Sequence, residues 1–230
     1  HRGGCSPASV LDNGCGTGVY LEEFARRGLD VCGYDLRAAM VNYARKRLSG
    51  IADHAELLQA DMREFKVANA YDMAICMNGS FQYLLTPEDM VQHLRAVYRA
   101  MREGGLYLVG LPAPEELMSN PPGSIRSGWT RERDGIEVQV DWTYRQHPID
   151  WRAQTFSGLA KIRVCDRSKT LSLELPYRYR VFFPQELEAL ACLSGCFRVM
   201  SVYGDFHLGR VYGRMQSPKL MLVLLQKTMS

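Results

Sequence analysis

A glycine-rich turn in the segment VLDNGCGTG, residues 10–18, constrains the fold of this chain more than any other feature. An apolar stretch leads into the turn, and the helical spacing of VYLEEFARRG follows it. Glycines let backbone amides approach a ligand that a Cβ atom would push away. The turn therefore predicts a ligand site between a buried strand and a helix.

Strands and helices alternate regularly up to residue 112. The expected strands cover residues 9–14, 30–35, 55–61, 71–77 and 106–112, and the expected helices cover residues 19–28, 38–48 and 86–104. Thr86 is the expected N-cap of the third helix, with Asp89 completing a capping box. This alternation is typical of a parallel sheet with helices on both faces.

The pattern changes after residue 112. Period-two stretches without helical segments predict an antiparallel insertion of three or four strands at residues 123–183. A helix at 184–195 and strands at 197–206 and 219–228 follow. We expect one α/β domain over residues 1–230, with a doubly wound, Rossmann-like, mostly parallel seven-stranded sheet and an antiparallel β insertion.

Composition and charge argue against several classes of protein. A net charge of +3 is too mild to indicate a nucleic-acid binder, and the longest apolar run, LMLVLL, is too short to span a bilayer. Seven cysteines without a CxxC pair indicate a reducing, cytoplasmic location, and the histidine spacing predicts no metal. The chain begins at His1 rather than Met, which leaves open a missing N-terminal segment that lids the site.

The glycine spacing distinguishes between nucleotide ligands. Gly14, Gly16 and Gly18 form GxGxG, whereas the dinucleotide fingerprint needs glycine where Val19 stands. The chain also lacks the GxxxxGK[ST] phosphate cradle. A pyrophosphate ligand is therefore disfavoured, and a plain tight turn is the alternative for the glycines alone.

Two carboxylates at the ends of expected strands point to an adenosine. Asp35 ends the second strand, where a carboxylate can accept hydrogen bonds from ribose hydroxyls; a helix N-cap is the alternative. Asp61 ends the third strand and can accept from an adenine amine. Leu36 and Met62 can then cover the faces of the ring.

Five blocks in order make residues 10–112 resemble the class I S-adenosylmethionine-dependent methyltransferases: VLDNGCGTG, GYDLRAAMVNYARKRL, LLQADMREF, YDMAICMNGSFQYL and MREGGLYLVGLP. The resemblance implies S-adenosyl-L-methionine as cofactor and S-adenosyl-L-homocysteine as product. The family usually has leucine at Asn13 and serine at Arg37, and a buried Asn13 should find a hydrogen-bond partner. The insertion resembles that of small-molecule methyltransferases and would cover the active site.

The resemblance also implies a cofactor site. Glycines 14, 16 and 18 would approach the methionine part of the cofactor while Asp12 orders the loop, and Asp35 would hold the ribose. The complete expected set is Asp12, Gly14, Gly16, Thr17, Gly18, Asp35, Leu36, Met40, Asp61, Met62, Met77 and Asn78, of which Met77 and Asn78 would face the amino-acid end.

The acceptor is predicted to be a small molecule. Methyltransferases of adenine or glutamine typically carry [DN]PP[YF] after the fourth strand, where this chain reads NGSF. We expect methyl transfer to an amine, with Tyr83 positioning the acceptor. His207, beside Asp205, is a second catalytic candidate as a base, with a solvated loop residue as the alternative. In YRYR, Arg178 and Arg180 share a face that is expected to be solvated.

Alternatives to amine methylation remain open from the sequence. One is O-methylation of a small molecule with His207 as base, and another is a non-catalytic cofactor-binding protein of the same fold. The methylated atom, the identity of the acceptor and the oligomeric state, a homodimer included, are left undetermined.

Overall fold

A mixed seven-stranded sheet lies at the centre of the computed structural model, which describes residues 6–119, 126–133, 135–143, 148–166, 169–207, 209–216 and 218–229. Its strand order is β10-β11-β5-β4-β1-β2-β3. These strands are β1 (Ser9–Asn13), β2 (Asp30–Asp35), β3 (Glu56–Gln59), β4 (Tyr71–Cys76), β5 (Met101–Pro112), β10 (Phe197–Tyr203) and β11 (Leu220–Lys227). Strands β1 to β5 pair in parallel, whereas β11 is antiparallel to both neighbours. The predicted α/β fold with a mostly parallel sheet is confirmed.

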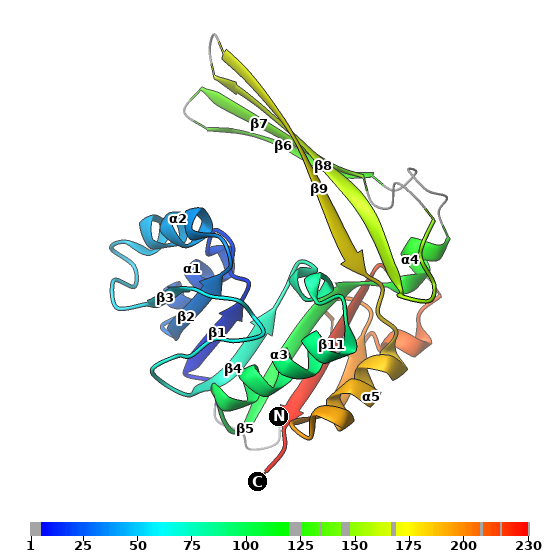
Figure 1. Ribbon diagram of the computed structural model, residues 1–230. Helices are drawn as coiled ribbons and strands as arrows, with labels where there is room; N and C mark the ends of the chain where they lie inside the picture. The colour runs from blue at the N-terminus through cyan, green and yellow to red at the C-terminus, as the bar shows by residue number, and fades with distance from the viewer. Residues whose placement is uncertain are drawn as a thin grey trace.

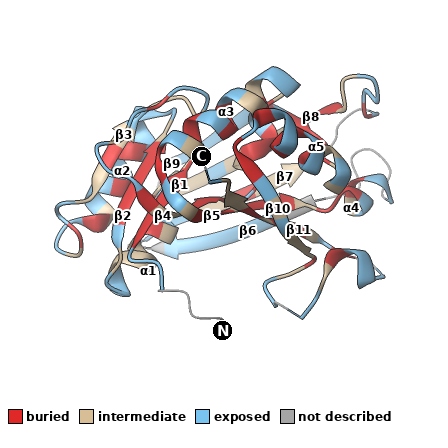
Figure 2. Ribbon diagram, turned by 90° about the horizontal axis from the view of Figure 1, so that it is seen from below, coloured by how far each residue is buried: buried red, intermediate tan, exposed pale blue. Residues whose placement is uncertain are grey.

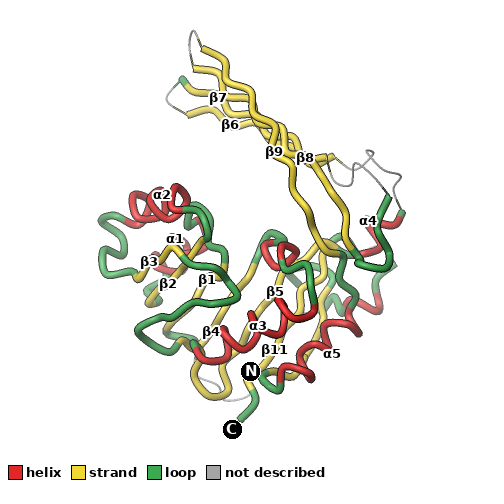
Figure 3. The backbone as a smooth tube through the Cα atoms, viewed as in Figure 1, coloured by secondary structure: helices red, strands yellow, loops and turns green. Residues whose placement is uncertain are grey.

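Helices cover both faces of this sheet (Figures 1 and 3). Helices α1 (Val19–Arg26) and α2 (Ala38–Leu48) share one apolar cluster with the strands, and α3 (Pro87–Arg99) and α5 (Pro184–Ser194) share the other. Three short elements are α4 (Pro114–Met118), the 3-10 turn η1 (Ser80–Tyr83) and the 3-10 turn η2 (Tyr212–Arg214). Figure 2 shows the buried residues gathered along the central strands and on the helix faces against them. This layering follows from the helical spacing of apolar residues, which gives each helix one face to bury.

The third helix begins as predicted and ends early. Thr86 Oγ1 accepts a hydrogen bond from the backbone amide of Asp89 at 3.1 Å, which confirms the cap. The predicted end at Gly104 is wrong, because the helix ends at Arg99 and the following residues belong to β5. Gly104 has a φ of 72° and lies where the pairing of β5 with β4 shifts register. A glycine that permits such a bulge looks the same in sequence as one that ends a helix.

The segment between α4 and α5 forms a second sheet. Its strands pair antiparallel in the order β6-β7-β8-β9, with β6 (Arg126–Arg133), β7 (Ile136–Thr143), β8 (Thr155–Asp166) and β9 (Lys169–Arg180). The antiparallel insertion is thus confirmed, although its predicted first residue, 123, lies outside the described residues. Figure 1 shows these strands, hereafter the arm, projecting from the main sheet.

A buried arginine fixes the base of the arm. The Arg180 guanidinium donates to the carbonyls of Leu85 and Ala153, each at 3.0 Å, and forms an ion pair with Glu186 at 2.6 Å. Its side chain is only 8% exposed, so the expectation of a solvated face is wrong for Arg180, while Arg178 is exposed. Through these contacts the Arg180 guanidinium links the arm to the loop after η1 and to helix α5.

A buried amide links the three central strands. Asn13, at the end of β1, is fully buried. Its Nδ2 donates to the carbonyl of Ile75 in β4 at 2.8 Å, and its Oδ1 accepts from the Tyr34 hydroxyl of β2 at 2.7 Å. Asn13 therefore has the predicted hydrogen-bond partner, and it has one on each neighbouring strand.

We predict that Asn13→Leu and Tyr34→Phe each lower the free energy of unfolding by about 1–3 kcal/mol, because each leaves a buried polar group unpaired. In the double variant the two losses should not add, since Asn13 and Tyr34 are direct partners. Urea unfolding of all four proteins measures this coupling. Additive losses would show that the two side chains act independently.

Candidate active site

The carboxyl ends of β1 and β4 lie side by side in the main sheet, although the chain continues from β1 toward β2 and from β4 toward β5. Loops diverge at such a switch point and leave a crevice at the carboxyl ends of the strands. Every predicted cofactor residue, and Tyr83 as well, lies at or just after the carboxyl end of one of strands β1 to β4. The fold therefore gathers these residues at one edge.

The glycine turn after β1 is held in a left-handed backbone. Gly14, Gly16 and Gly18 have φ angles of 75°, 53° and 77°, which side chains disfavour. A Cβ atom on Gly14 would lie 3.1 Å from the Cβ of Ser80, at the start of η1. The amide of Gly14 donates to the carbonyl of Tyr34 at 3.1 Å. The turn is thus fixed to β2 and lies directly against the segment that follows β4.

The carboxylate of Asp35 connects the glycine turn to helix α2. Its Oδ2 accepts from the amide of Gly16 at 3.0 Å, and its Oδ1 accepts from the amide of Arg37 at 2.9 Å. Each carboxylate oxygen can accept a further hydrogen bond, so Asp35 keeps capacity for ribose hydroxyls. Leu36 is 65% exposed and Met40 is 37% exposed, which leaves apolar surface beside this carboxylate.

Asp12 is a buried carboxylate with an unsatisfied oxygen. It is 1% exposed, and its Oδ2 has no hydrogen-bond partner within the described part of the chain. Burial, and secondly the negative charge of Asp35, raise the pKa of Asp12 to about 7. Orphaned buried oxygens are rare in native proteins. A cationic ligand would offset the cost of this buried negative charge, whereas a pyrophosphate would add negative charge beside two acids.

The loop after β3 places Asp61 beside a cation. Arg63 pairs with Asp61 at 2.7 Å and with Asp89 of α3 at 3.0 Å. The hydrogen bond from Arg63 is the main cause that lowers the pKa of Asp61, so this side chain stays an ionised acceptor. It remains 33% exposed and open to a ligand.

A buried histidine holds the next residue of that loop. His93 Nδ1 lies 2.9 Å from the carbonyl of Met62, and Nε2 lies 2.6 Å from the Tyr107 hydroxyl. Because a carbonyl only accepts, Nδ1 carries the proton and Nε2 accepts from Tyr107. Burial lowers the pKa of His93 to about 4, which keeps the ring neutral. The sequence contains no sign of this role for His93, because its partners Met62 and Tyr107 lie on other elements.

The segment after β4 brings Tyr83 next to the arm. Tyr83 is 51% exposed, and its hydroxyl lies 3.3 Å from that of Tyr179 in β9, with the two rings edge to face at 4.7 Å. Asn78 adopts a left-handed φ of 56° and accepts from the Tyr20 hydroxyl at 3.2 Å. Met77 is buried just before it. Tyr179 was not predicted as a site residue, since only the tertiary fold brings β9 to η1.

His207 lies apart from this constellation. It follows β10, which is separated from β4 by β5 and β11 in the sheet. Its side chain is 79% exposed. Nδ1 lies 3.3 Å from Asp205 Oδ1, which also accepts from the His207 amide at 2.8 Å. Thus Tyr83 lies on η1, the segment whose Ser80 lies against the glycine turn, whereas His207 follows a strand at the far edge of the sheet.

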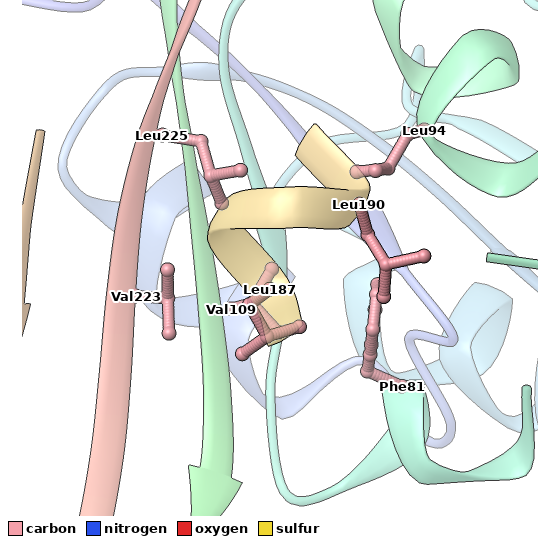
Figure 4. Close-up of a pocket in the computed structure, with 7 residues that line it drawn as sticks. All are labelled: Phe81, Leu94, Val109, Leu187, Leu190, Val223 and Leu225. Carbon is pink, nitrogen blue, oxygen red and sulfur yellow. The ribbon is translucent and has the colours of Figure 1, made fainter. Parts of the chain in front are cut away.

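One pocket within the described residues is a packing void in the core. Figure 4 shows its lining, which is Phe81, Leu94, Val109, Leu187, Leu190, Val223 and Leu225. These side chains are apolar, and the cavity of about 10 Å³ has room for about one water molecule. It is therefore far too small for a nucleotide.

The described residues contain no group of three or more His, Cys, Asp and Glu side chains that could hold a metal ion. Over the same residues, the helices are too short or too polar to cross a bilayer. The six cysteines in the described part are unpaired. The cytoplasmic location and the lack of a nucleic-acid partner stay predictions.

Known proteins are similar to the part of the chain that contains strands β1 to β4 and their carboxyl ends. Residues 10–105 match the family described as a methyltransferase domain. Residues 10–105 of this chain therefore carry a methyltransferase domain. A solved S-adenosylmethionine-dependent methyltransferase from Clostridium acetobutylicum shares the fold with a TM-score of 0.76 at 16% identity, over 96% of this chain and 84% of that one. The resemblance expected from the sequence is confirmed.

Two curated proteins are similar over part of their length. A dTDP-3-amino-3,4,6-trideoxy-alpha-D-glucopyranose N,N-dimethyltransferase of Streptomyces venezuelae is 34% identical over 102 residues, which are 44% of this chain and 41% of that protein. A ubiquinone biosynthesis O-methyltransferase of Acinetobacter baylyi is 37% identical over 84 residues, 34% of each protein. The methyltransferase domain thus matches about two fifths or less of these relatives.

The geometry fits S-adenosylmethionine. That molecule is cationic at its sulfonium and its ammonium, and it carries no phosphate. The unsatisfied oxygen of Asp12 and the adjacent charge of Asp35 favour such a ligand. The left-handed glycines leave the backbone bare for a close approach.

We predict that Asp12→Asn stabilises the free protein at alkaline pH. Its folded pKa of about 7 lies above the ordinary value of 3.8, so the folded state holds an extra proton between these values. The free energy of unfolding should therefore fall as pH rises from about 4 to 7, and Asp12→Asn should remove this part of the slope. At pH 8 the gain should be at most on the order of 4 kcal/mol, which is what a difference of about three pKa units corresponds to. Urea unfolding at pH 5 and 8 measures it, with the exposed Glu188→Gln as control; an unchanged slope would contradict the burial argument.

Two substitutions at His93 separate its two hydrogen bonds. Asparagine places an N–H near the position of Nδ1 and keeps the bond to Met62, whereas glutamine reaches toward Tyr107 and loses that bond. We expect His93→Gln to weaken S-adenosylhomocysteine binding about three- to tenfold more than His93→Asn, in line with one hydrogen bond. Calorimetry measures the affinities, and thermal unfolding checks that stability is matched. Equal affinities would mean that the Met62 loop does not contact the cofactor.

Proposed function

We propose that this protein transfers the methyl group of S-adenosylmethionine to a small-molecule acceptor, an amine in the first place, by direct displacement at the sulfonium methyl. The contact between the glycine turn and η1 carries this proposal. Gly14 and Ser80 are neighbours there, so the expected cofactor residues and the exposed Tyr83 lie at one edge of the sheet. A cofactor on the glycine turn would then face an acceptor beside Tyr83.

The proposed cofactor contacts follow the strand ends. Asp35 holds the ribose, Asp61 and Met62 face the adenine, and Met77 and Asn78 face the amino-acid end. Asp12 compensates positive charge on the ligand, and Thr17, Leu36 and Met40 complete the lining. The bound cofactor supplies an electrophilic methyl group. The main work of the chain is therefore to align the acceptor and exclude water, rather than to create a leaving group.

An amine acceptor fits the surroundings of Tyr83. A neutral amine carries its own lone pair and needs a base only to shed a proton. In the described structure the hydroxyl next to Tyr83 belongs to Tyr179, and the ring of His207 lies beside Asp205. Tyr83 and Tyr179 would position the acceptor, with His207 as the base only if that acceptor is a hydroxyl. The dimethyltransferase relative named for an amino sugar supports the amine, and the relative named as an O-methyltransferase keeps the alternative in view.

The division of the chain is part of the same proposal. We treat residues 1–230 as one methyltransferase domain in which residues 123–183 are inserted. The base of the arm would cover the acceptor, because Tyr179 of β9 contacts Tyr83 of η1.

The function is tested by following S-adenosylhomocysteine formation with a panel of nucleotide-linked amino sugars, free amines and phenols. Asp35→Ala should weaken cofactor binding at least about tenfold, because it removes charge-assisted hydrogen bonds to the ribose. Tyr83→Phe should leave cofactor affinity unchanged and lower kcat by roughly ten- to a hundredfold, as expected when positioning is lost. A loss of cofactor affinity in Asp35→Ala and a loss of kcat in Tyr83→Phe would thus distinguish a cofactor contact from an acceptor contact.

Three outcomes would overturn parts of this proposal. Equal cofactor affinity in Asp35→Ala and the parent would remove Asp35 from the ribose site. Binding without turnover across the panel would favour a non-catalytic cofactor-binding protein. Complete loss of turnover in His207→Ala with intact cofactor affinity would make His207 a base and a hydroxyl the better acceptor.

A further inference from the structure

An Asn-Gly turn follows β4 and places Asn78 at the proposed cofactor site. Asn78 and Gly79 have φ angles of 56° and 76°, and the amide of Ser80 donates to the carbonyl of Met77 at 3.2 Å. Two left-handed residues inside a hydrogen-bonded turn are typical of type I′, for which Asn-Gly is a preferred pair. The local sequence therefore fixes the backbone of Asn78, and its exposed side chain starts from a well-defined turn.

A tyrosine from another element holds this side chain. Tyr20 is the second residue of α1, and its hydroxyl donates to Asn78 Oδ1 at 3.2 Å. The Tyr20 ring packs against the apolar cluster that contains residues of β1, β2 and α2, which restricts where the hydroxyl can lie. This hydrogen bond joins the helix that follows the glycine turn to the turn that follows β4.

The Tyr20 hydroxyl is a lasting donor close to a negative charge. Burial, and secondly the charge of Asp12, raise the pKa of Tyr20, while the hydrogen bond to Asn78 lowers it less. The phenol therefore stays protonated at neutral pH. Because Asp12 is one of the causes, the phenol also lies near enough to that buried carboxylate to interact with it.

The hydrogen bond from Tyr20 decides which end of the Asn78 amide a ligand meets. With Oδ1 directed at the Tyr20 hydroxyl, Nδ2 presents its two N–H donors elsewhere. Such donors suit a carboxylate, whereas the unsatisfied oxygen of Asp12 suits a cation. The amino-acid end of S-adenosylmethionine carries both an ammonium and a carboxylate, so its two charges match these two side chains.

We propose that Tyr20 is a positioning residue for the cofactor: its hydroxyl orients Asn78 so that Nδ2 donates to the carboxylate of the amino-acid end. This inference rests on the proposed function, in which Met77 and Asn78 face that end. It adds Tyr20 to the site and gives the Asn78 side chain a defined partner on the ligand. The ammonium is left to Asp12.

The test compares two ligands that differ only at the end in question. S-adenosylhomocysteine carries the amino-acid end, whereas 5′-methylthioadenosine replaces it by a methyl group on the same sulfur. Tyr20→Phe should weaken S-adenosylhomocysteine binding about three- to tenfold, in line with one lost hydrogen bond, and leave 5′-methylthioadenosine binding unchanged. A purely structural role of Tyr20 would instead weaken both ligands alike. Calorimetry measures the affinities, and thermal unfolding checks that each variant is folded.

Two substitutions at Asn78 test the carboxylate contact. Aspartate tolerates a left-handed φ as asparagine does, so Asn78→Asp keeps the turn and replaces the donors by a negative charge. It should weaken S-adenosylhomocysteine binding at least about tenfold, because like charges then meet, and spare 5′-methylthioadenosine. Asn78→Gly removes the side chain without backbone strain. Adding Tyr20→Phe to Asn78→Gly should cause no further loss, since Tyr20 acts through Asn78.

Tyr98→Phe is the matched control. Tyr98 lies near the carboxyl end of α3, just before β5 begins, and thus at the opposite edge of the sheet. This variant should bind both ligands as the parent does.

Three outcomes overturn the inference while the parent still binds S-adenosylhomocysteine and the proposed function stands. They are an unchanged affinity of Tyr20→Phe for S-adenosylhomocysteine, an equal loss for both ligands in that variant, and an unchanged affinity of Asn78→Asp. A parent that binds neither ligand overturns the cofactor assignment of the proposed function, and this inference with it.

Discussion

The hydrogen-bonded position of β1 between β2 and β4 is the constraint on which the rest of this structure depends. Asn13 reinforces it from inside, since one side-chain amide binds Tyr34 on one neighbour and Ile75 on the other. This arrangement fixes the start of the glycine turn relative to the strand that leads into η1. Without it, the glycine turn and Ser80 would not be in contact, and the proposed cofactor and acceptor residues would not share one edge.

The same edge contains an electrostatic strain that a ligand can relieve. Asp35 is well satisfied by two backbone amides, but Asp12 beside it is buried with an oxygen that lacks a partner. A buried carboxylate next to a second one is costly to ionise, and the raised pKa of Asp12 expresses that cost. The free protein thus gives up some stability to keep negative charge where a cationic cofactor fits. Marginal stability at functional sites is a common consequence of such preorganisation.

The two ends of the arm differ, because its base is packed against the main domain and its outer part is exposed. At the base, Arg180 ties it to α5 and to the loop after η1, and Tyr179 meets Tyr83 at the proposed acceptor site. A buried ion pair with several hydrogen bonds imposes a definite geometry, which suits a segment that must place an aromatic side chain. Toward the tip, the same alternation of residues that buries Tyr177 and Tyr179 leaves the leucines of β9 without cover from the described residues. One periodic pattern therefore both places Tyr179 against Tyr83 and leaves leucines exposed toward the tip.

The sequence by itself determined the order of strands and helices along the chain, the methyltransferase domain and the position of the glycine turn, because those signals are local. Hydrophobic periodicity, helix caps and glycine spacing each depend on residues within about one element. The predicted cap at Thr86 is therefore correct, whereas the bulge at Gly104 depends on the pairing of β5 with β4 and cannot be predicted from local sequence. Only the tertiary structure decided that His93 holds Met62, that Tyr179 reaches Tyr83, that Arg180 is buried and that His207 lies apart. These relations join residues from different elements, and their distances depend on how the sheet, the helices and the arm pack. Burial is likewise a property of the whole fold, so no local pattern distinguishes the buried Arg180 from the exposed Arg178 two residues before it.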